Sequence, residues 1–313
     1  MTNLIKTFEP NLLGRDFVIS DLHGSYSALA MMIDGLKFDP EVDRMFSVGD
    51  LVDRGEESLK CLELVREPWF HPVKANHEVM MLDAFSDGPT GFYWTMNGGM
   101  WGIEALNDAL ALLDDTKGRI PQDDSVALFD LLPIVERLPY LITIKMKDGK
   151  KFHVIHAELP PNYMITDEDL EDSEILRQLI SVQTIDGSFF TWGRHKFQPF
   201  YGVNLENVDK IARTVKYKFP NYKEQSEGLS HIISGHTVVQ KPLTILGQTN
   251  IDTCAFDSWV KYEPHRHSSP KWCALTAVQL DTWKFYQATE HLFREVQPVT
   301  INKDVIDNLK GDQ

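Results

Sequence analysis

Short apolar runs and stretches of helical spacing alternate along the first third of the chain. The apolar runs that predict buried strands lie at residues 16–20, 45–48 and 71–73. Residues with helical spacing follow each run, and they predict helices at 25–36, 58–65 and 79–85. Ser25, at the start of the first helix, is a favoured N-cap residue. This order of elements predicts an α/β fold with a mostly parallel sheet covered by helices.

The rest of the chain predicts other elements. Residues 102–139 have helical spacing, with interruptions expected at Pro121 and Pro133. Asp148-Gly149 lies between two apolar runs, and this arrangement predicts a β-hairpin. The strands expected in this part of the chain lie at residues 140–145, 151–155, 231–234, 243–246, 274–280 and 283–286. No stretch between the two parts has the composition of a linker.

Composition and charge limit the class of protein. The 313 residues are 42% hydrophobic, which is enough for a folded core. No apolar stretch approaches the roughly 20 residues of a membrane-spanning helix, and residues 1–10 do not resemble a secretory signal. The three cysteines are far apart in the sequence, which favours a reducing compartment. The formal charge of 31 − 46 = −15 disfavours nucleic acid and membranes as partners. We therefore expect a cytoplasmic protein.

Polar residues are concentrated directly after the predicted strands. The segments concerned are Asp21-Leu22-His23-Gly24, residues 49–55, Asn76-His77-Glu78, His156 and Gly235-His236-Thr237. In an open α/β sheet, ligands bind in the crevice outside the carboxyl ends of the strands. The polar loops are therefore expected to converge on one site.

The donor types in these loops predict a metal centre. Carboxylate, imidazole and amide donors without cysteine suit manganese, iron or zinc. Two such ions about 3.5–4 Å apart can acidify a bridging water and polarise a phosphoryl oxygen. The predicted ligands are Asp21 and His23 for one ion, Asn76, His156 and His236 for the other, and Asp50 bridging both. Each residue alone has a plain structural explanation, such as a buried histidine with a hydrogen-bond partner, so the interpretation depends on the joint pattern.

The same motifs resemble the signature of the calcineurin-like metallophosphoesterases, and within them the phosphoprotein phosphatases of the lambda type. The resemblance covers residues 16–99 and shorter segments at 154–157, 191–194, 231–237 and 251–255. It implies a metallophosphoesterase fold, in which a central β-sandwich of mixed sheets is flanked by helices. It also implies a single catalytic domain over residues 16–290, with extensions at 1–15 and 291–313.

The resemblance implies a metal-dependent phosphomonoesterase. Its substrates would be phosphoserine and phosphothreonine in proteins, together with small phosphate esters, attacked directly by a hydroxide that bridges two divalent ions. Manganese is the first choice of metal, with iron and zinc as alternatives. His77 would be the general acid and Asp53 would hold its imidazolium, while Arg54 and Arg194 would bind the phosphoryl oxygens. The oligomeric state is not indicated.

Two other functions are compatible with the same motif order. A symmetrical diadenosine tetraphosphate hydrolase is one, but such relatives typically lack the aspartate before the motif arginine, which is Asp53 here. A non-catalytic metal-binding scaffold is the other, although such members tend to lose ligands or the catalytic histidine, and His77 is present.

The chain also departs from the family pattern. Ser20 and Ala75 replace motif glycines, which would strain the backbone only where a positive φ is needed. Residues 257–271 form an insertion that either overhangs the cleft or is a solvated loop. The aromatic residues Phe92, Tyr93, Trp94 and Trp101 are predicted to belong to the core.

Overall fold

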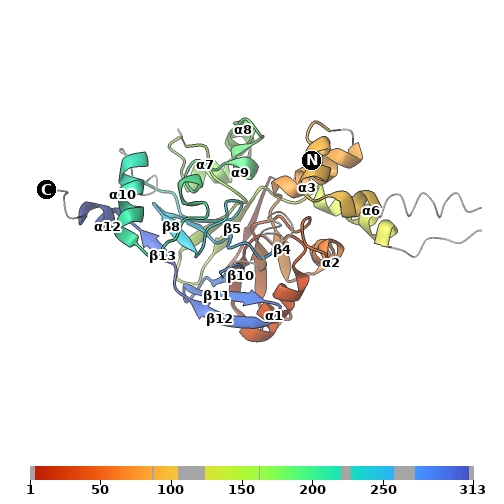
Figure 1. Ribbon diagram of the computed structural model, residues 1–313, viewed down its shortest axis with the longest axis horizontal. Coiled ribbons are helices and arrows are strands. Elements are labelled where there is room, and N and C mark those ends of the chain that lie inside the picture. Colours follow the sequence, from red (N-terminus) through yellow and green to blue (C-terminus); the bar gives the residue numbers. More distant parts are fainter. Residues whose placement is uncertain are drawn as a thin grey trace, which may run out of the picture.

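The strands form two mixed sheets in the computed structural model, which describes residues 4–86, 88–104, 124–161, 163–219, 227–256 and 272–309 (Figure 1). The seven-stranded sheet contains, in spatial order, β1 (Ile5–Phe8), β5 (Leu141–Lys145), β6 (Lys151–Val154), β7 (His231–Ser234), β9 (Gln248–Asn250), β8 (Leu243–Ile245) and β13 (Val299–Ile301). The six-stranded sheet contains β12 (Leu292–Val296), β11 (Lys284–Thr289), β10 (Leu275–Gln279), β2 (Asp16–Ile19), β3 (Arg44–Ser47) and β4 (Phe70–Pro72).

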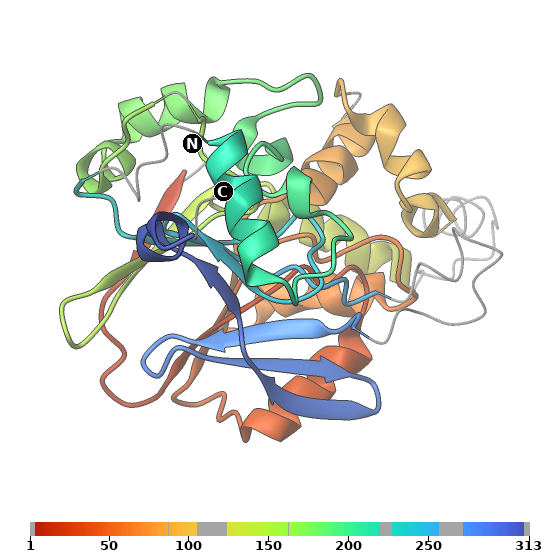
Figure 2. The same ribbon diagram turned by 60° about the vertical axis from the view of Figure 1, so that its left-hand side comes forward.

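Helices flank both sheets. They are α1 (Tyr26–Leu36), α2 (Ser58–Glu63), α3 (Asn76–Ser86), α4 (Gly91–Met96), α6 (Asp124–Val135), α7 (Asp167–Glu171), α8 (Ser173–Ser181), α9 (Phe189–Trp192), α10 (Val208–Lys218) and α12 (Lys303–Asp307). The segments η1 (Leu64–Arg66) and η2 (Gln198–Phe200) are short 3₁₀ helices. In Figure 1, α7, α8 and α9 lie above the sheets and α1 lies below them, and Figure 2 shows the same separation after rotation. The predicted α/β class, with two mixed sheets flanked by helices, is confirmed.

The two sheets pack face to face, as the predicted β-sandwich requires. Val18 and Phe46 of the six-stranded sheet share one buried apolar cluster with Ile144, Val154 and Ile233 of the seven-stranded sheet. The outer face of the six-stranded sheet packs against α1, α2, α3 and α6, and that of the seven-stranded sheet packs against α8 and α9. All four residues of β2 are buried, because both faces of this strand are covered.

The strands β2, β3 and β4 are parallel neighbours, as the alternating pattern of the first third predicted. The Asp-Gly hairpin is also confirmed, since β5 and β6 pair antiparallel and Gly149 has a φ of +85°. Ser25 is the N-cap residue of α1, but its side chain makes no capping hydrogen bond.

The interruption predicted at Pro133 is wrong, because α6 continues through Pro133 to Val135. A proline at position 133 removes one hydrogen bond of the helix, to the Phe129 carbonyl, and burial of Leu131 and Val135 in the core stabilises the helix on both sides of it. Helix α3 begins at Asn76, earlier than predicted, so its first turn carries Asn76 and His77. The predictions for Pro121 and for the insertion at 257–271 lie outside the described residues.

Strands from both predicted extensions join the sheets. β1 pairs with β5 in the seven-stranded sheet, β12 pairs with β11, and β13 pairs with β8. The domain boundaries at residues 16 and 290 stay predictions. Across the described segments, every helix is too short or too polar to cross a membrane.

Candidate metal centre

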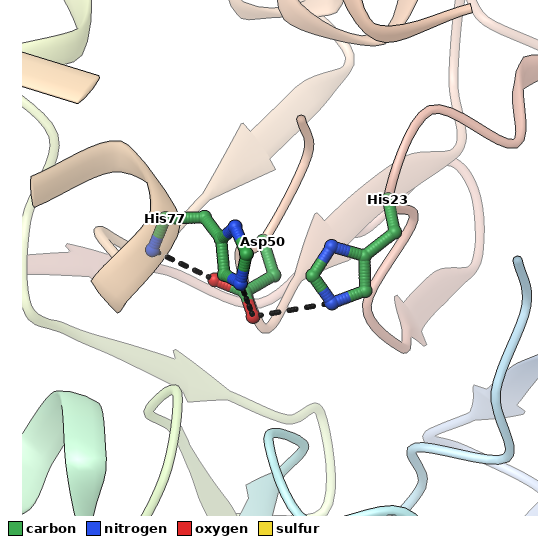
Figure 3. Close-up of side chains that lie close together, drawn as sticks. All are labelled: His23, Asp50 and His77. Atoms are coloured by element: carbon green, nitrogen blue, oxygen red, sulfur yellow. Dashed lines mark hydrogen bonds and ion pairs between the residues drawn. The ribbon is translucent and has the colours of Figure 1, made fainter. Parts of the chain in front are cut away.

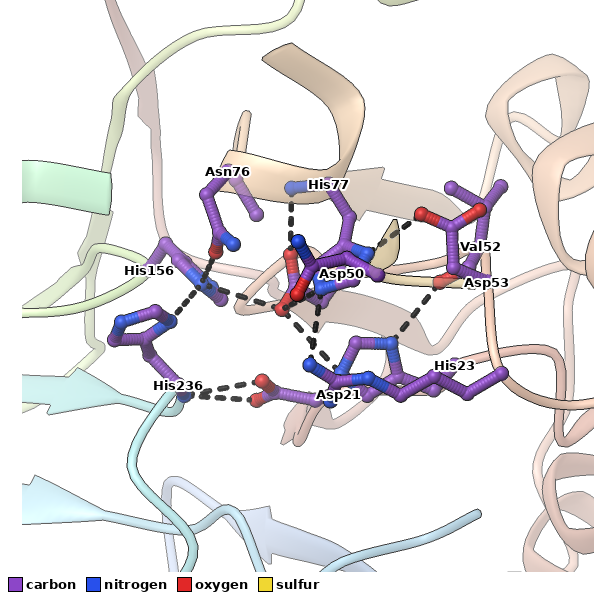
Figure 4. A network of polar contacts seen from close by, with 12 residues as sticks. Asp21, His23, Asp50, Val52, Asp53, Asn76, His77, His156 and His236 are labelled. Carbon is purple, nitrogen blue, oxygen red and sulfur yellow. Dashed lines mark hydrogen bonds and ion pairs between the residues drawn. The ribbon is translucent and has the colours of Figure 1, made fainter. Parts of the chain in front are cut away.

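The predicted ligands lie in loops that leave the carboxyl ends of strands. β2, β3 and β4 are parallel in one sheet, and β6 and β7 are parallel in the other, so their ends bring these loops together. Figure 4 shows the side chains pointing toward one another around Asp50. All six are buried, namely Asp21, His23, Asp50, Asn76, His156 and His236.

Asp50 is at the centre of this network. Its Oδ2 lies 3.4 Å from His23 Nε2, 3.5 Å from His156 Nε2 and 3.9 Å from His77 Nε2. Figure 3 shows His23 and His77 beside the Asp50 carboxylate, and their rings meet edge to face with centroids 4.7 Å apart. Burial alone would raise the pKa of Asp50, but the surrounding imidazoles together with the Arg54 guanidinium hold it below its usual range. Asp50 is therefore a carboxylate that can serve two cations at once.

Two groups of potential metal ligands share Asp50. Within each group, one ligand atom per residue lies within 4.8 Å of the others; the groups are His23, Asp50 and His77, and Asp50, His156 and His236. Asn76 adds its amide oxygen to the second group, at 2.8 Å from His156 Nε2. The prediction of two candidate metal sites around Asp50 is confirmed.

The predicted ligand Asp21 belongs to neither group among the described residues. Its carboxylate instead accepts hydrogen bonds from the backbone N–H of His236 at 3.0 and 3.2 Å. Burial raises the pKa of Asp21 well above its ordinary value, and the carboxylates of Asp252 and Asp50 raise it further. A cation near these three carboxylates would remove their mutual repulsion, so the surroundings of Asp21 fit a metal ion.

The histidines present lone pairs to the centre. Nδ1 of His23 donates to the Val52 carbonyl at 3.0 Å, and Nδ1 of His156 donates to the Val48 carbonyl at 2.8 Å. A carbonyl can only accept, so both protons are on Nδ1 and both Nε2 atoms carry a lone pair. Burial lowers the pKa of both histidines, which keeps them neutral. Backbone carbonyls fix the tautomer of metal-binding histidines in this way.

His236 gives further support for a bound cation. Its Nδ1 lies 3.0 Å from His156 Nε2, which carries a lone pair. Its Nε2 is buried and has no hydrogen-bond partner within the part of the chain that the structure describes. Burial lowers the pKa of His236 well below its ordinary value, so a second proton is disfavoured. The converging nitrogen and oxygen donors therefore fit a divalent metal, and manganese, iron and zinc all accept such donors.

Strained backbone is concentrated at this site. Five functional residues other than glycine have positive φ: His23 (44°), Asp50 (49°), Asp53 (75°), Arg54 (72°) and His236 (69°). Such conformations cost free energy and persist where the surroundings impose them. Here the N–H groups of Leu22 and His23 both donate to the Asp50 carbonyl, at 3.0 and 2.8 Å, which ties the first two loops together.

The two departures from the motif glycines cause no such strain, because neither Ser20 nor Ala75 has a positive φ. Gly49 explains how Ala75 fits. Gly49 has a φ of +90°, and a Cβ added to it would lie 2.6 Å from the Ala75 Cβ. The missing side chain of Gly49 therefore makes room for the methyl group of Ala75.

Glu78 anchors the loop that carries Asp50, a role that the motif alone did not reveal. Its Oε2 accepts from the N–H of Asp50 and of Ala75, both at 3.1 Å, and its Oε1 accepts from the N–H of Leu51 at 2.8 Å. All of these groups are buried. A sequence signal was present, since Glu78 ends the Ala75-Asn76-His77-Glu78 motif.

Glu78→Gln should lower the free energy of unfolding by about 1–3 kcal/mol, because the amide NH₂ replaces an oxygen that accepts from a buried N–H. Urea unfolding measures the change. The matched control is Glu63→Gln on the exposed side of α2, which should leave the transition unchanged. Equal midpoints for the two variants would show that this loop is held without the second oxygen of Glu78.

Beside the candidate metal ligands lies a buried histidine–carboxylate pair. Nδ1 of His77 is 2.6 Å from Asp53 Oδ2, and the backbone N–H of His77 donates to Asp50 Oδ1 at 3.1 Å. The His77 side chain is therefore held by Asp53, and its backbone is held by Asp50. This is the pair that the resemblance implied for the general acid.

The two predicted arginines border the same centre. The Arg54 guanidinium lies 2.6 Å from His23 Nε2 and 3.1 Å from His77 Nε2, and it stacks over the Phe256 ring at 4.9 Å. Arg194 donates from Nη1 to the His236 carbonyl at 3.2 Å. Sequence reasoning missed Phe256, because nothing in its position after the strand motif indicates a stacking role.

Comparison with known proteins agrees with this geometry. The sequence pattern of the calcineurin-like phosphoesterases matches residues 17–240. The chain is 36% identical over 200 residues to serine/threonine-protein phosphatase 2 of Escherichia coli, covering 64% of this chain and 84% of that protein. It is 28% identical over 242 residues to serine/threonine-protein phosphatase 2 of Salmonella typhimurium, covering 77% and 88%. A shorter match is to the symmetrical bis(5'-nucleosyl)-tetraphosphatase of Aggregatibacter actinomycetemcomitans. It is 40% identical over 65 residues and covers 20% of this chain and 24% of that protein.

Proposed function

This chain belongs to the calcineurin-like phosphoesterases, and we propose that it hydrolyses phosphoserine and phosphothreonine in proteins with two divalent metal ions, manganese in the first place. The observation that supports this most directly is the buried Asp50 carboxylate shared by two groups of ligand atoms. The substrate class comes from the similarity to a serine/threonine-protein phosphatase over 84% of its length.

The metal ligands that we propose are those expected from the sequence. Asp21, His23 and Asp50 would hold one ion, and Asp50 with Asn76, His156 and His236 would hold the other. When bound, two such ions polarise a phosphoryl oxygen and acidify a water. We assign His77 to proton transfer instead of metal binding, as the resemblance implies, because the Asp53 carboxylate at its Nδ1 can stabilise the charged form of the ring.

The two guanidinium groups would bind the phosphoryl oxygens. Burial lowers the pKa of Arg194, and the charge of Arg54 lowers it further. The two cations therefore repel each other. A phosphoryl dianion between them would relieve this repulsion, and charge-assisted hydrogen bonds from guanidinium strengthen as negative charge develops on the oxygens.

His77 would give a proton to the leaving alkoxide from Nε2. Its Nδ1 hydrogen bond to Asp53 fixes the ring orientation, and the buried carboxylate stabilises the imidazolium. Serine and threonine alkoxides are poor leaving groups without a proton, so this step suits the proposed substrates.

A second candidate function is hydrolysis of dinucleoside polyphosphates, which the short match to symmetrical tetraphosphatases favours. That match covers only 20% of this chain. Asp53, which such relatives typically lack, favours the protein phosphatase.

Parallel turnover of a phosphoserine peptide, diadenosine tetraphosphate and a phosphodiester with Mn²⁺ tests the choice. We expect the peptide to have the highest kcat/KM, because the site offers a proton donor for an alkoxide leaving group. The Asp50→Asn protein, prepared in parallel, measures contaminating activity. A higher kcat/KM for diadenosine tetraphosphate than for the peptide would contradict the proposed function and support the second candidate.

A further inference from the structure

The Asp53 carboxylate is fully buried, yet it is held by hydrogen bonds on both oxygens. Besides His77 Nδ1 on Oδ2, Trp94 Nε1 donates to Oδ1 and Oδ2 at 3.0 Å each, and Trp101 Nε1 donates to Oδ1 at 2.7 Å. A buried carboxylate needs such donors, since its charge is otherwise costly. Asp53 is therefore bound by two indole N–H groups on the side away from the histidine.

An indole N–H is well suited to this position because it can only donate. A water or a hydroxyl group could rotate and accept a proton from Asp53, whereas the two indoles cannot. With Oδ1 occupied by Trp101 and Trp94 bridging both oxygens, the second oxygen points to His77 Nδ1 at 2.6 Å. The tryptophans thus determine which carboxylate oxygen faces the imidazole.

The surrounding chain is built to bring the tryptophans to Asp53. Trp94 lies in α4 and is fully buried, and Trp101 lies in the helical residues 100–104. The two rings meet edge to face, with centroids 6.1 Å apart. A Cβ on Gly99 or on Gly102 would overlap the Trp94 ring, so these glycines let the segment wrap around it.

Gly98 connects the same segment to the catalytic loop. It has a φ of +110°, and a Cβ added there would lie 2.7 Å from the backbone nitrogen of Arg54. The glycines of this segment therefore have a packing role, and they place both indoles next to residues 53 and 54. The prediction that the aromatic residues here are core is confirmed for Trp94, and Trp101 packs against the same core, but it is wrong for Phe92 and Tyr93, which are exposed.

We propose that Trp94 and Trp101 are positioning residues, whose indole N–H groups hold the Asp53 carboxylate in place with Oδ2 aimed at His77 Nδ1. The proposal rests on the proposed function, in which His77 protonates the leaving group. In this role neither tryptophan needs to touch the substrate. Their effect passes through Asp53 to His77, and it is confined to substrates that need a proton on the leaving oxygen.

Trp101→Phe tests the proposal, because phenylalanine retains an aromatic ring but lacks the N–H. We expect kcat on an alkyl phosphate, glycerol 2-phosphate, to fall on the order of tenfold, the worth of one hydrogen bond to a charged group. KM, metal content and kcat on 4-nitrophenyl phosphate should stay close to the wild-type values. Trp94→Phe should lower the same rate. If Trp94→Phe does not fold, the result for Trp101→Phe alone tests the proposal.

The double variant Trp101→Phe/His77→Asn gives the sharper result. If Trp101 acts through His77, the double variant should be no slower on glycerol 2-phosphate than His77→Asn alone. The matched control is Trp69→Phe, which removes an indole N–H that donates to the exposed Glu67, and it should leave both rates unchanged.

The proposal is overturned if Trp101→Phe lowers kcat equally on glycerol 2-phosphate and 4-nitrophenyl phosphate. It is also overturned if, in the double variant, the loss of kcat from Trp101→Phe adds in full to the loss from His77→Asn. The assay needs only small phosphate esters. Failure of the wild-type protein on the phosphopeptide would count against the proposed protein substrate and would leave this comparison intact.

Discussion

Asp50→Asn should abolish turnover and lower the metal content at both sites. Asp50 Oδ2 lies within 3.5 Å of His23 Nε2 and of His156 Nε2, which belong to different groups of ligand atoms. Asparagine keeps the size of the side chain but replaces a carboxylate oxygen by NH₂, which cannot bind a cation. The loss therefore reaches both ions, and elemental analysis alongside phosphatase assays measures it.

Asp186→Asn is the matched control for that variant. Asp186 is exposed in the turn before α9, and its substitution should change neither metal content nor rate. The bridging assignment would be wrong if inactive Asp50→Asn still held two full equivalents of metal. Thermal unfolding with and without Mn²⁺ gives a second readout, because a ligand that binds only the folded state raises its stability.

Much of the fold could be predicted because the patterns are local. The parallel strands at the start of the chain each form a short buried run, and each helix that follows shows its apolar side at regular spacing. The Asp-Gly turn at residues 148–149 is equally local. Pro133 was misjudged because tertiary packing of Leu131 and Val135, which a local pattern cannot reveal, keeps α6 helical to its end.

The composition of the site could be predicted, but its contacts could not. Motif spacing after strand ends indicated which residues converge. It did not indicate that Asp21 accepts two hydrogen bonds from the His236 backbone, or that His77 Nε2 lies as near to Asp50 as 3.9 Å. Such contacts depend on the positive φ angles of these loops and on Glu78, which holds them from behind.

The tryptophan contacts show the same limit. Trp94 and Trp101 are more than 40 residues away from Asp53 in the sequence, and aromatic residues in a helical stretch indicate core. Only the three-dimensional structure shows that both indole N–H groups reach one carboxylate. A buried aspartate beside a catalytic histidine does imply that donors must exist, but the sequence does not say which residues provide them.

His77→Asn should lower kcat on alkyl phosphates by about 10²–10⁴, the usual contribution of a general acid. The loss should shrink on 4-nitrophenyl phosphate, whose leaving group departs without a proton. Asp53→Asn should behave as a milder form of the same variant, since it removes the carboxylate 2.6 Å from His77 Nδ1. Arg54→Ala should differ from both by also raising KM, because it removes a phosphate-binding group.

Metal content separates the two possible roles of His77, because its Nε2 also lies in a group of ligand atoms with His23 and Asp50. If His77 donates the proton and Asp21 is the ligand, His77→Asn keeps both ions while Asp21→Asn loses one. The opposite result would be that His77→Asn loses one ion, Asp21→Asn keeps both, and His77→Asn lowers kcat equally on alkyl and aryl phosphates. It would show that His77 is a metal ligand and that Asp21 only accepts hydrogen bonds. His291→Asn, at an exposed position, controls for the substitution itself. The leaving-group comparison and the metal analysis thus test the same assignment through independent measurements, one of the proton and one of the ion.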